Sequence, residues 1–430
     1  MTITGRAVLL ALLGMVPAAL EPGWPTLLGW WALWILAVGV DVLLAGSPRG
    51  IAVERAPLPS VRLGELIEAP YVLANHGRRR VRGLVRDGWQ PSAGVRADRA
   101  RIDLPGGQRR RLVTTLCPTR RGDRRVEHVT VRSVGPLGLG ARQVSLPAAG
   151  QLRVLPPFTS RKHLPSKLSR LRELDGRTSL RVRGQGTEFD SLRDYVIGDD
   201  VRSIDWRATA RRSQVVVRTW RPERDRRVLL VLDTSRTSAA RIGDAPRLDA
   251  AMDAALLLAA LASRAGDRVD LLAMDRRVRA RVEGASRTDL LPSLVEAMAP
   301  LEADLVEADW TAIVSAVRAR MTQRALVVLL TPLEAAAIEE GLLPVIHRLT
   351  SHHQVVLASV ADPAVHAMAT GRGDAYAVYG AAAAERAGLD RAGITAELMR
   401  SGVDVVDAGP EDLPPRLADR YLALKAAGKL

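Results

Sequence analysis

The feature that most constrains this chain is an apolar segment near its amino terminus, Thr26 to Leu44, in which Asp41 is the only charged residue. Its nineteen residues would form a helix about 28 Å long, close to the roughly 30 Å core of a bilayer. A shorter apolar run, Ala7 to Leu20, precedes it and is interrupted only by Gly14 and Pro17. The sequence therefore predicts an amino-terminal pair of membrane helices.

Charges around the two runs predict how this hairpin, residues 1–48, lies in the membrane. Arg6 precedes the first run, Arg49 and Arg55 follow the second, and the turn between them carries Glu21. The positive-inside rule then places both ends of the hairpin in the cytoplasm, together with the rest of the chain. Two alternatives stay open, a cleaved signal peptide and a buried helical hairpin in a soluble protein.

Residues 49–155 have a different pattern, with short alternating or β-branched runs separated by turn signals. This pattern predicts a small β-sandwich. The segment Gly135–Gly140 resembles a glycine-rich nucleotide loop, but no helical pattern follows it, so a β-turn is expected. Arginine clusters at 78–80, 109–111 and 120–121 are expected at solvated strand ends; phosphate contacts are the alternative.

Composition excludes several classes of protein. Cys117 is the only cysteine, which excludes a disulfide scaffold, and 47% hydrophobic residues exclude disorder as the main state. The net charge of +15 permits binding to nucleic acid or anionic lipid. Because the chain is rich in arginine and alanine throughout, the charge indicates compositional bias, and nucleic-acid binding is not favoured.

A dense polar motif lies in residues 156–227, after a linker, where acids and arginines alternate with aromatic residues. Since a guanidinium binds a carboxylate through two hydrogen bonds, this pattern predicts an ordered, internally paired element or a docking surface. The alternative is a metal-dependent hydrolase that uses the acidic cluster at 188–205. The residues expected to form the motif are Glu188, Arg193, Asp199, Asp200, Arg202, Asp205, Trp206 and Arg211.

The motif resembles the hallmark of the family called domain of unknown function fifty-eight. The string Gly-x-Glu-Phe, Arg-x-Tyr, Gly-Asp-Asp-x-Arg-x-Ile-Asp-Trp and Ala-Arg stands between Gly186 and Arg211. The Trp-rich apolar start, the β-rich middle and the ending Tyr421-Leu422-x-Leu424-Lys425 extend the resemblance. It implies a membrane-anchored protein with a von Willebrand factor type A-like domain. It also implies an AAA ATPase of the MoxR type as partner, because such an ATPase is often encoded beside members of the family.

Residues 228–430 alternate strand and helix patterns. Continuous apolar runs such as Val228–Leu232 and Ala325–Leu330 are typical of strands covered on both faces, and Leu248 to Ala262 has helical spacing. This alternation predicts a doubly wound, mostly parallel sheet, which agrees with the type A-like domain that the resemblance implies. Function in such sheets lies at the carboxyl ends of the strands.

A candidate metal site follows the first of these strands. Its sequence matches the Asp-x-Ser-x-Ser/Thr loop of the metal-ion-dependent adhesion site of that fold, whose oxygens suit Mg²⁺. The expected ligands are Asp233, Ser235, Thr237 and Thr288. The site is incomplete, because Pro332 stands where an acid is expected, with Glu334 as a substitute. Capping of the following turn by Asp233 and Ser235 is the alternative.

These observations predict an interaction protein of the cell membrane, with two membrane helices and a cytoplasmic soluble part. Its type A-like domain would bind a partner through a metal-assisted surface at the strand ends. With the MoxR-type ATPase as partner, it would act in envelope or protein-assembly work. No Walker A loop, G-x-S-x-G elbow or H-E-x-x-H motif occurs, so nothing specifies an enzyme. A hydrolase and a nucleic-acid-binding module stay as alternatives.

Overall fold

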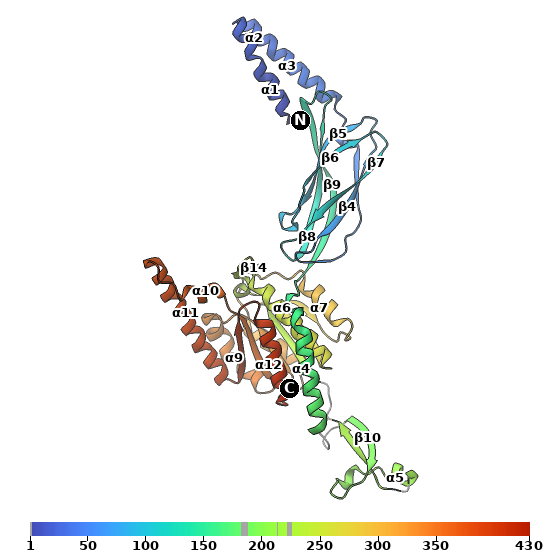
Figure 1. The fold of residues 1–430 in the computed structure, drawn as a ribbon, viewed down its shortest axis with the longest axis vertical. Helices are drawn as coiled ribbons and strands as arrows, with labels where there is room; N and C mark the ends of the chain where they lie inside the picture. The colour runs from blue at the N-terminus through green and yellow to red at the C-terminus, as the bar shows by residue number, and fades with distance from the viewer. Residues whose placement is uncertain (1, 182–187, 213, 222–225) are drawn as a thin grey trace. The chain divides into compact units, whose positions relative to one another are not determined.

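Figure 1 shows the computed structural model, which describes residues 2–181, 188–212, 214–221 and 226–430. Contacts divide the chain into two compact units, Met1–Pro156 and Pro157–Leu430. The finer division into four parts, at residues 48, 155 and 227, stays a prediction.

The first unit begins with three apolar helices. They are α1 (Gly5–Leu13), α2 (Met15–Leu20) and α3 (Trp24–Leu44). In the part of the chain that the structure describes, α3 with its continuation to Gly50 is the one helix long and apolar enough to cross a membrane, with a mean hydropathy of 2.0. The first apolar run is divided at Gly14 into two short helices. α1 lies against α3, where the Trp34 indole nitrogen donates to the Ala7 carbonyl at 2.7 Å.

The rest of the first unit consists of two sheets. One has the order β1-β9-β8-β5-β6, with β3 paired to β9, and the other has the order β2-β4-β7. Their strands are β1 (Thr2–Ile3), β2 (Ile51–Arg55), β3 (Val61–Arg62), β4 (Ile67–Asn75), β5 (Val81–Trp89), β6 (Arg99–Leu104), β7 (Arg109–Leu116), β8 (Gly122–Val134) and β9 (Gly140–Leu155). Leu73 of the second sheet shares a buried cluster with Val85 and Val131 of the first. In the interior, the Asp87 carboxylate binds the Arg55 guanidinium, and both side chains are almost fully buried.

The centre of the second unit is a six-stranded sheet with the order β16-β15-β12-β17-β18-β19, in which β16 is antiparallel to β15. The strands are β12 (Arg227–Asp233), β15 (Arg268–Met274), β16 (Val278–Val282), β17 (Leu326–Leu330), β18 (Gln354–Val360) and β19 (Val403–Ala408). From β12 the chain winds outward through β15 and β16, and then on the other side through β17 to β19. The predicted doubly wound, mostly parallel sheet is therefore confirmed, and its winding reverses between β12 and β17.

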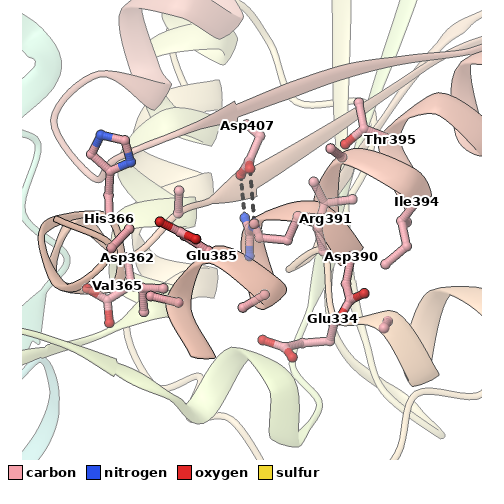
Figure 2. A pocket seen from close by; sticks show the side chains of 18 of the residues that line it. Glu334, Asp362, Val365, His366, Glu385, Asp390, Arg391, Ile394, Thr395 and Asp407 are labelled. Carbon is pink, nitrogen blue, oxygen red and sulfur yellow. Dashed lines mark hydrogen bonds and ion pairs between the residues drawn. The ribbon is translucent and has the colours of Figure 1, made fainter. Parts of the chain in front are cut away.

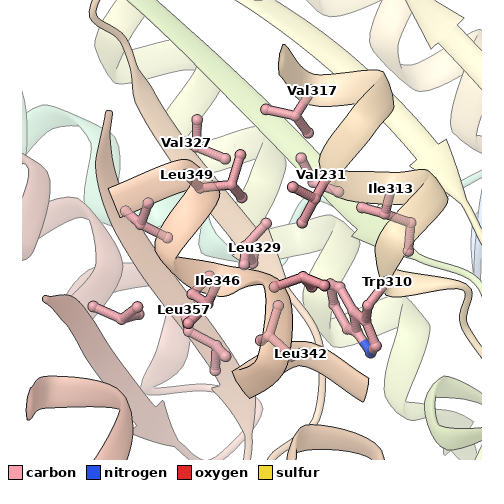
Figure 3. Packing of buried hydrophobic residues seen from close by; sticks show 14 of the residues in the cluster. Val231, Trp310, Ile313, Val317, Val327, Leu329, Leu342, Ile346, Leu349 and Leu357 are labelled. Carbon is pink, nitrogen blue, oxygen red and sulfur yellow. The ribbon is translucent and has the colours of Figure 1, made fainter. Parts of the chain in front are cut away.

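Helices cover both faces of this sheet. The helices described around it are α4 (Leu164–Arg181), α6 (Arg247–Arg264), α7 (Leu290–Met298), α8 (Trp310–Arg320), α9 (Leu343–Thr350), α10 (Pro363–Met368), α11 (Ala375–Arg400) and α12 (Leu413–Ala426). Of these, α4 packs on α6 and α12, and α10 packs on α11. Figure 3 shows one face, where Trp310 of α8 and Ile346 of α9 pack with Val231 and Leu329 of the central strands. Since side chains alternate along a strand, Leu230 points to the opposite face, where α6 contacts β12 and β15.

The carboxyl-terminal string has a structural role. The Lys425 ammonium donates to the carboxylate of Asp267 at 3.0 Å, and both side chains are buried. The Tyr421 hydroxyl donates to the same carboxylate. These residues therefore hold α12 to the connection between α6 and β15.

A two-stranded antiparallel hairpin, which we call the arm, carries most of the polar motif. It consists of β10 (Glu188–Asp194), a 3₁₀ turn (Val201–Ser203), α5 (Trp206–Arg212) and β11 (Val216–Arg221). Gly186 and Thr187 of the family string lie outside the described residues, and of Glu188 the structure describes only the backbone, which pairs with Arg221.

Candidate functional site

The predicted metal loop lies where the winding of the sheet reverses. Asp233 ends β12, and Thr331 directly follows the neighbouring parallel strand β17. The Thr331 hydroxyl donates to Asp233 Oδ2 at 2.7 Å. The carboxyl ends of these two strands are therefore joined by one side-chain hydrogen bond at the position where open α/β sheets bind ligands.

The Asp233 carboxylate is buried, with 2% of the residue exposed, and it is fully engaged by protein donors. Besides Thr331, the backbone N–H of Ser235 donates to Oδ1 at 2.8 Å, and the Thr237 hydroxyl donates to Oδ2 at 3.2 Å. Burial raises the pKa of this carboxyl group above its ordinary value, against the opposing effect of these hydrogen bonds. The arrangement is a hydrogen-bonded hub between two strand ends.

The other predicted ligands do not complete a cation site. The Thr288 hydroxyl is bonded to Ser286 at 2.9 Å, on an exposed turn before α7, and no hydrogen bond among the described residues joins it to Asp233. Glu334 does not replace the missing acid, because it pairs with the buried guanidinium of Arg247 at 3.1 Å. Within the described residues there is no group of three His, Cys, Asp or Glu that fits a metal ion. One carboxylate, already occupied by three donors, does not fit the hard-oxygen set that Mg²⁺ requires.

A segment that the sequence did not identify takes the place expected for the Thr288 loop. The backbone N–H of Asp304 donates to the Thr234 carbonyl at 2.9 Å, and the N–H of Arg236 donates to the Val306 carbonyl at 2.9 Å. The Thr234 hydroxyl also donates to the buried carboxylate of Asp275 at 3.0 Å. The connection between α7 and α8 thus holds the Asp233 loop in place.

Beside this loop is a groove of about 720 Å³ at the carboxyl ends of β17, β18 and β19. Figure 2 shows its lining, in which Arg391 of α11 makes two hydrogen bonds of 2.6 and 3.2 Å to Asp407. Arg391 also donates to the Ser359 hydroxyl at 3.1 Å. No pattern in the sequence predicts this groove, since it depends on α10 and α11, for which the sequence shows no clear helical spacing.

Two carboxylates of the arm are paired internally. Asp199 accepts two hydrogen bonds of 2.6 and 2.7 Å from Arg193, and Asp205 accepts one of 2.8 Å from Arg218. The backbone N–H of Arg207 also donates to Asp205, at 3.0 Å. Asp200 caps the 3₁₀ turn by accepting from the Arg202 N–H. The carboxylates therefore organise the loop between β10 and β11.

The arm also carries a set of exposed apolar side chains, which we call the arm surface. They are Val196, Ile197, Val201 and Trp206. Ile197 is 97% exposed and Trp206 is 68% exposed, while the nearby Arg202 and Arg211 are exposed as well. Exposed apolar groups gathered on one small element are typical of a surface that binds another molecule.

Titration of the arm carboxyl groups tests this pairing. The guanidinium of Arg193 lowers the pKa of Asp199, and the Ala208 N–H, followed by the Arg218 guanidinium, lowers the pKa of Asp205. For an acid with a lowered pKa, the pairing stabilises the fold above the ordinary pKa and is lost as the pH falls through the lowered value. Carboxyl ¹³C NMR should place both transitions below about 3.9. Ordinary values for both groups would contradict the ion pairs.

Residues 191–392, which span most of the arm and five strands of the large sheet, match the family described as "Protein of unknown function DUF58". No curated protein matches the chain. Among solved structures, it is similar to the conserved hypothetical protein BatB from Bacteroides thetaiotaomicron, with 16% identity, a TM-score of 0.30 and coverage of 46% of this chain and 98% of that chain. It is also similar to the SpRpn10 VWA domain, with 12% identity, a TM-score of 0.27 and coverage of 45% and 94%. A third similar structure is the PapD-like domain 7 of human CEP192, with 19% identity, a TM-score of 0.17 and coverage of 25% and 89%.

Proposed function

We propose that this chain, of which residues 191–392 match the DUF58 family of proteins of unknown function, is a membrane-anchored interaction protein whose arm binds a partner protein. The observation that carries the proposal is the arm surface, in which Ile197 and Trp206 are exposed on an element where the carboxylates of Asp199 and Asp205 are already paired. Tryptophan is enriched among the residues that dominate binding at protein interfaces. The function is that of a docking element.

The same pairing disfavours the alternative of a metal-dependent hydrolase. A catalytic carboxylate must be free to accept a proton or to bind a metal. Asp199 and Asp205 are instead occupied by Arg193, Arg218 and backbone N–H groups. In this proposal, Asp199 and Asp205 maintain the conformation of the arm. No metal is proposed at the Asp233 hub.

The proposed partner is an AAA ATPase of the MoxR type, acting in envelope or protein-assembly work. This choice is supported by the family resemblance, because an ATPase of this type is often encoded beside members of the family. A nucleic-acid partner is not favoured, because the arm presents exposed apolar side chains beside its exposed arginines, and two further arginines, Arg193 and Arg218, are paired with acids.

The membrane anchor is part of the proposal. The length and hydropathy of α3 support one crossing, and the contact of α1 with α3 supports a hairpin in which both apolar runs enter the bilayer. Arg6 and Arg49 flank the hairpin, which favours a cytoplasmic soluble part in the cell membrane. The buried cluster shared by the two sheets of the first unit supports a β-sandwich next to the anchor in the chain.

Substitution of the arm surface tests the docking proposal. Trp206→Ser combined with Ile197→Ser should weaken binding of the purified full-length chain to the purified MoxR-type ATPase by about 30-fold or more, as expected for loss of an interface anchor. Biolayer interferometry in detergent measures the dissociation constant. Because both side chains are exposed, the melting temperature should stay the same.

Tyr379→Ser is a matched control, since Tyr379 is a 79% exposed aromatic residue on α11, outside the arm. It should leave the affinity unchanged. If the arm variant binds as well as the wild type, the arm is not the docking element. If Tyr379→Ser alone weakens binding, the partner binds at α11 instead.

A further inference from the structure

We propose that arginines at the ends of α1 and α3 form a binding site for the phosphate group of anionic phospholipids. The inference rests on the proposed membrane anchor and concerns a surface different from the arm. The residues, which we call the basic collar, are Arg6, Arg49, Arg78 and Arg79.

Two loops of the first unit bring the collar to the end of the membrane helix. In the loop between β4 and β5, the Arg79 guanidinium donates to the carbonyl of Leu43 in the last turn of α3, at 2.8 Å. The loop between β8 and β9 binds Asp41 of the same helix through the backbone N–H groups of Leu139 and Gly140, at 2.7 and 2.8 Å. These contacts place the loops at the point where the apolar surface of α3 ends.

Arg6 and Arg49 lie beside the same two loops. A Cβ placed on Gly138 would come within 3.0 Å of the Arg6 guanidinium, so this side chain lies over the β8–β9 loop. Arg49 belongs to the short turn after α3, where Gly50 closely approaches the backbone of Gly77 in the β4–β5 loop. The four arginines, from three segments far apart in the sequence, therefore lie around one end of the helix pair.

The positive charge of the collar is not neutralised by the protein. All four arginines are exposed, and none of them forms an ion pair with an acidic residue of the described chain. The nearby Arg80 differs, because it pairs with Asp103. Asp41 does not compensate the charge either, since it is fully buried and receives three backbone hydrogen bonds.

The chemistry of the surroundings identifies a lipid as the source of the phosphate. Next to the collar, Leu43 and Leu44 of α3 are 63% and 52% exposed. An anionic phospholipid offers a phosphate to the arginines and acyl chains to these leucines, whereas free phosphate or nucleic acid uses only the charge. Each arginine near an anionic membrane surface contributes about 1 kcal/mol, which is about fivefold in affinity.

The test compares lipid binding by the full-length chain in detergent, with dissociation constants for phosphatidylglycerol and phosphatidylcholine from native mass spectrometry. The wild type should prefer phosphatidylglycerol. The triple variant Arg6→Gln, Arg49→Gln and Arg78→Gln should lose most of this preference, at least about tenfold. Arg79 stays unchanged because it binds Leu43.

The matched control removes three other exposed arginines, by Arg96→Gln, Arg120→Gln and Arg125→Gln. Arg120 and Arg125 flank the start of β8, at the opposite end of that strand from the β8–β9 loop. This variant has the same net charge and should keep the preference. An equal loss in both variants would show a nonspecific charge effect and overturn the site.

Two further results separate the possible failures. Inorganic phosphate should not displace the bound phosphatidylglycerol at millimolar concentration, and displacement would overturn the lipid as ligand. Carbonate extraction of membranes tests the anchor independently. A chain that resists extraction but shows no lipid preference keeps the membrane proposal and refutes the basic collar, whereas a chain released by carbonate refutes both.

Discussion

Replacement of Asp41 by alanine is expected to destabilise the first unit by about 2–5 kcal/mol. The Asp41 carboxylate accepts hydrogen bonds from the backbone N–H groups of Leu137, Leu139 and Gly140, at 2.7, 2.7 and 2.8 Å. Leu139 and Gly140 are buried, so their N–H groups would lose the acceptor without gaining water. An unsatisfied buried donor costs about 1–3 kcal/mol.

Hydrogen exchange measured by mass spectrometry on the chain in detergent tests this expectation. Peptides that contain residues 137–140 should lose protection in Asp41→Ala, because these amides are no longer bonded to a carboxylate. Asp41→Asn should have an intermediate effect, since one acceptor oxygen remains. Glu21→Ala, in the turn between the apolar runs, should have none. Unchanged protection in Asp41→Ala would show that the carboxylate does not hold the loop.

The same contact explains the glycine-rich segment that resembled a nucleotide loop. A Cβ on Gly135 would lie 2.4 Å from the Asp41 side chain, and a Cβ on Gly140 would lie 2.2 Å from Val42. The glycines are thus required for the close approach of the loop to α3. The loop does bind an anion through its backbone, but the anion is a carboxylate of the same chain. No periodicity in the sequence relates Asp41 to residues almost a hundred positions later.

The sequence predicts the large sheet well where strands are buried on both faces. The apolar runs at Val228–Leu232 and Ala325–Leu330 form the central strands β12 and β17, with bounds that differ by at most one residue. Such runs are recognisable because every side chain is apolar. The 26-residue helix α11 was missed, since many of its residues are small or exposed and its apolar residues have no clear spacing.

The candidate site was predictable only in part, because spacing along the sequence relates neighbouring residues but not residues of separate elements. Asp233, Ser235 and Thr237 are close in sequence, and their spacing correctly brings them together. Thr288 was assigned to the same site by the order of elements alone, but the loop that contacts Thr234 comes after the next helix. Thr331 directly precedes Pro332 in the sequence. Because an acid was expected at this place, the hydroxyl of Thr331 was not predicted to bind Asp233.

Asp233→Ala is expected to destabilise the second unit by about 2–4 kcal/mol. The substitution removes the acceptor of three donors, among them the buried Thr331 hydroxyl and the buried Ser235 N–H. At 2–4 °C per kcal/mol for a unit of this size, the melting transition should fall by about 4–16 °C. Burial raises the pKa of the Asp233 carboxyl group. The group therefore contributes less to the stability of the fold as the pH rises from the ordinary pKa of an aspartic acid to the raised pKa.

Calorimetry with and without Mg²⁺ distinguishes the hydrogen-bonded hub from a metal site. A ligand that binds only the folded state stabilises it in proportion to the logarithm of its concentration. If Asp233 is a hydrogen-bonded hub, the melting temperature of the wild type should not change between EDTA and Mg²⁺. The lower melting temperature of Asp233→Ala should not change either. Ser235→Ala should cost less than Asp233→Ala, because the backbone N–H that Ser235 donates to the carboxylate remains in the variant. A rise with Mg²⁺ that is present in the wild type and absent in Asp233→Ala would restore the metal interpretation.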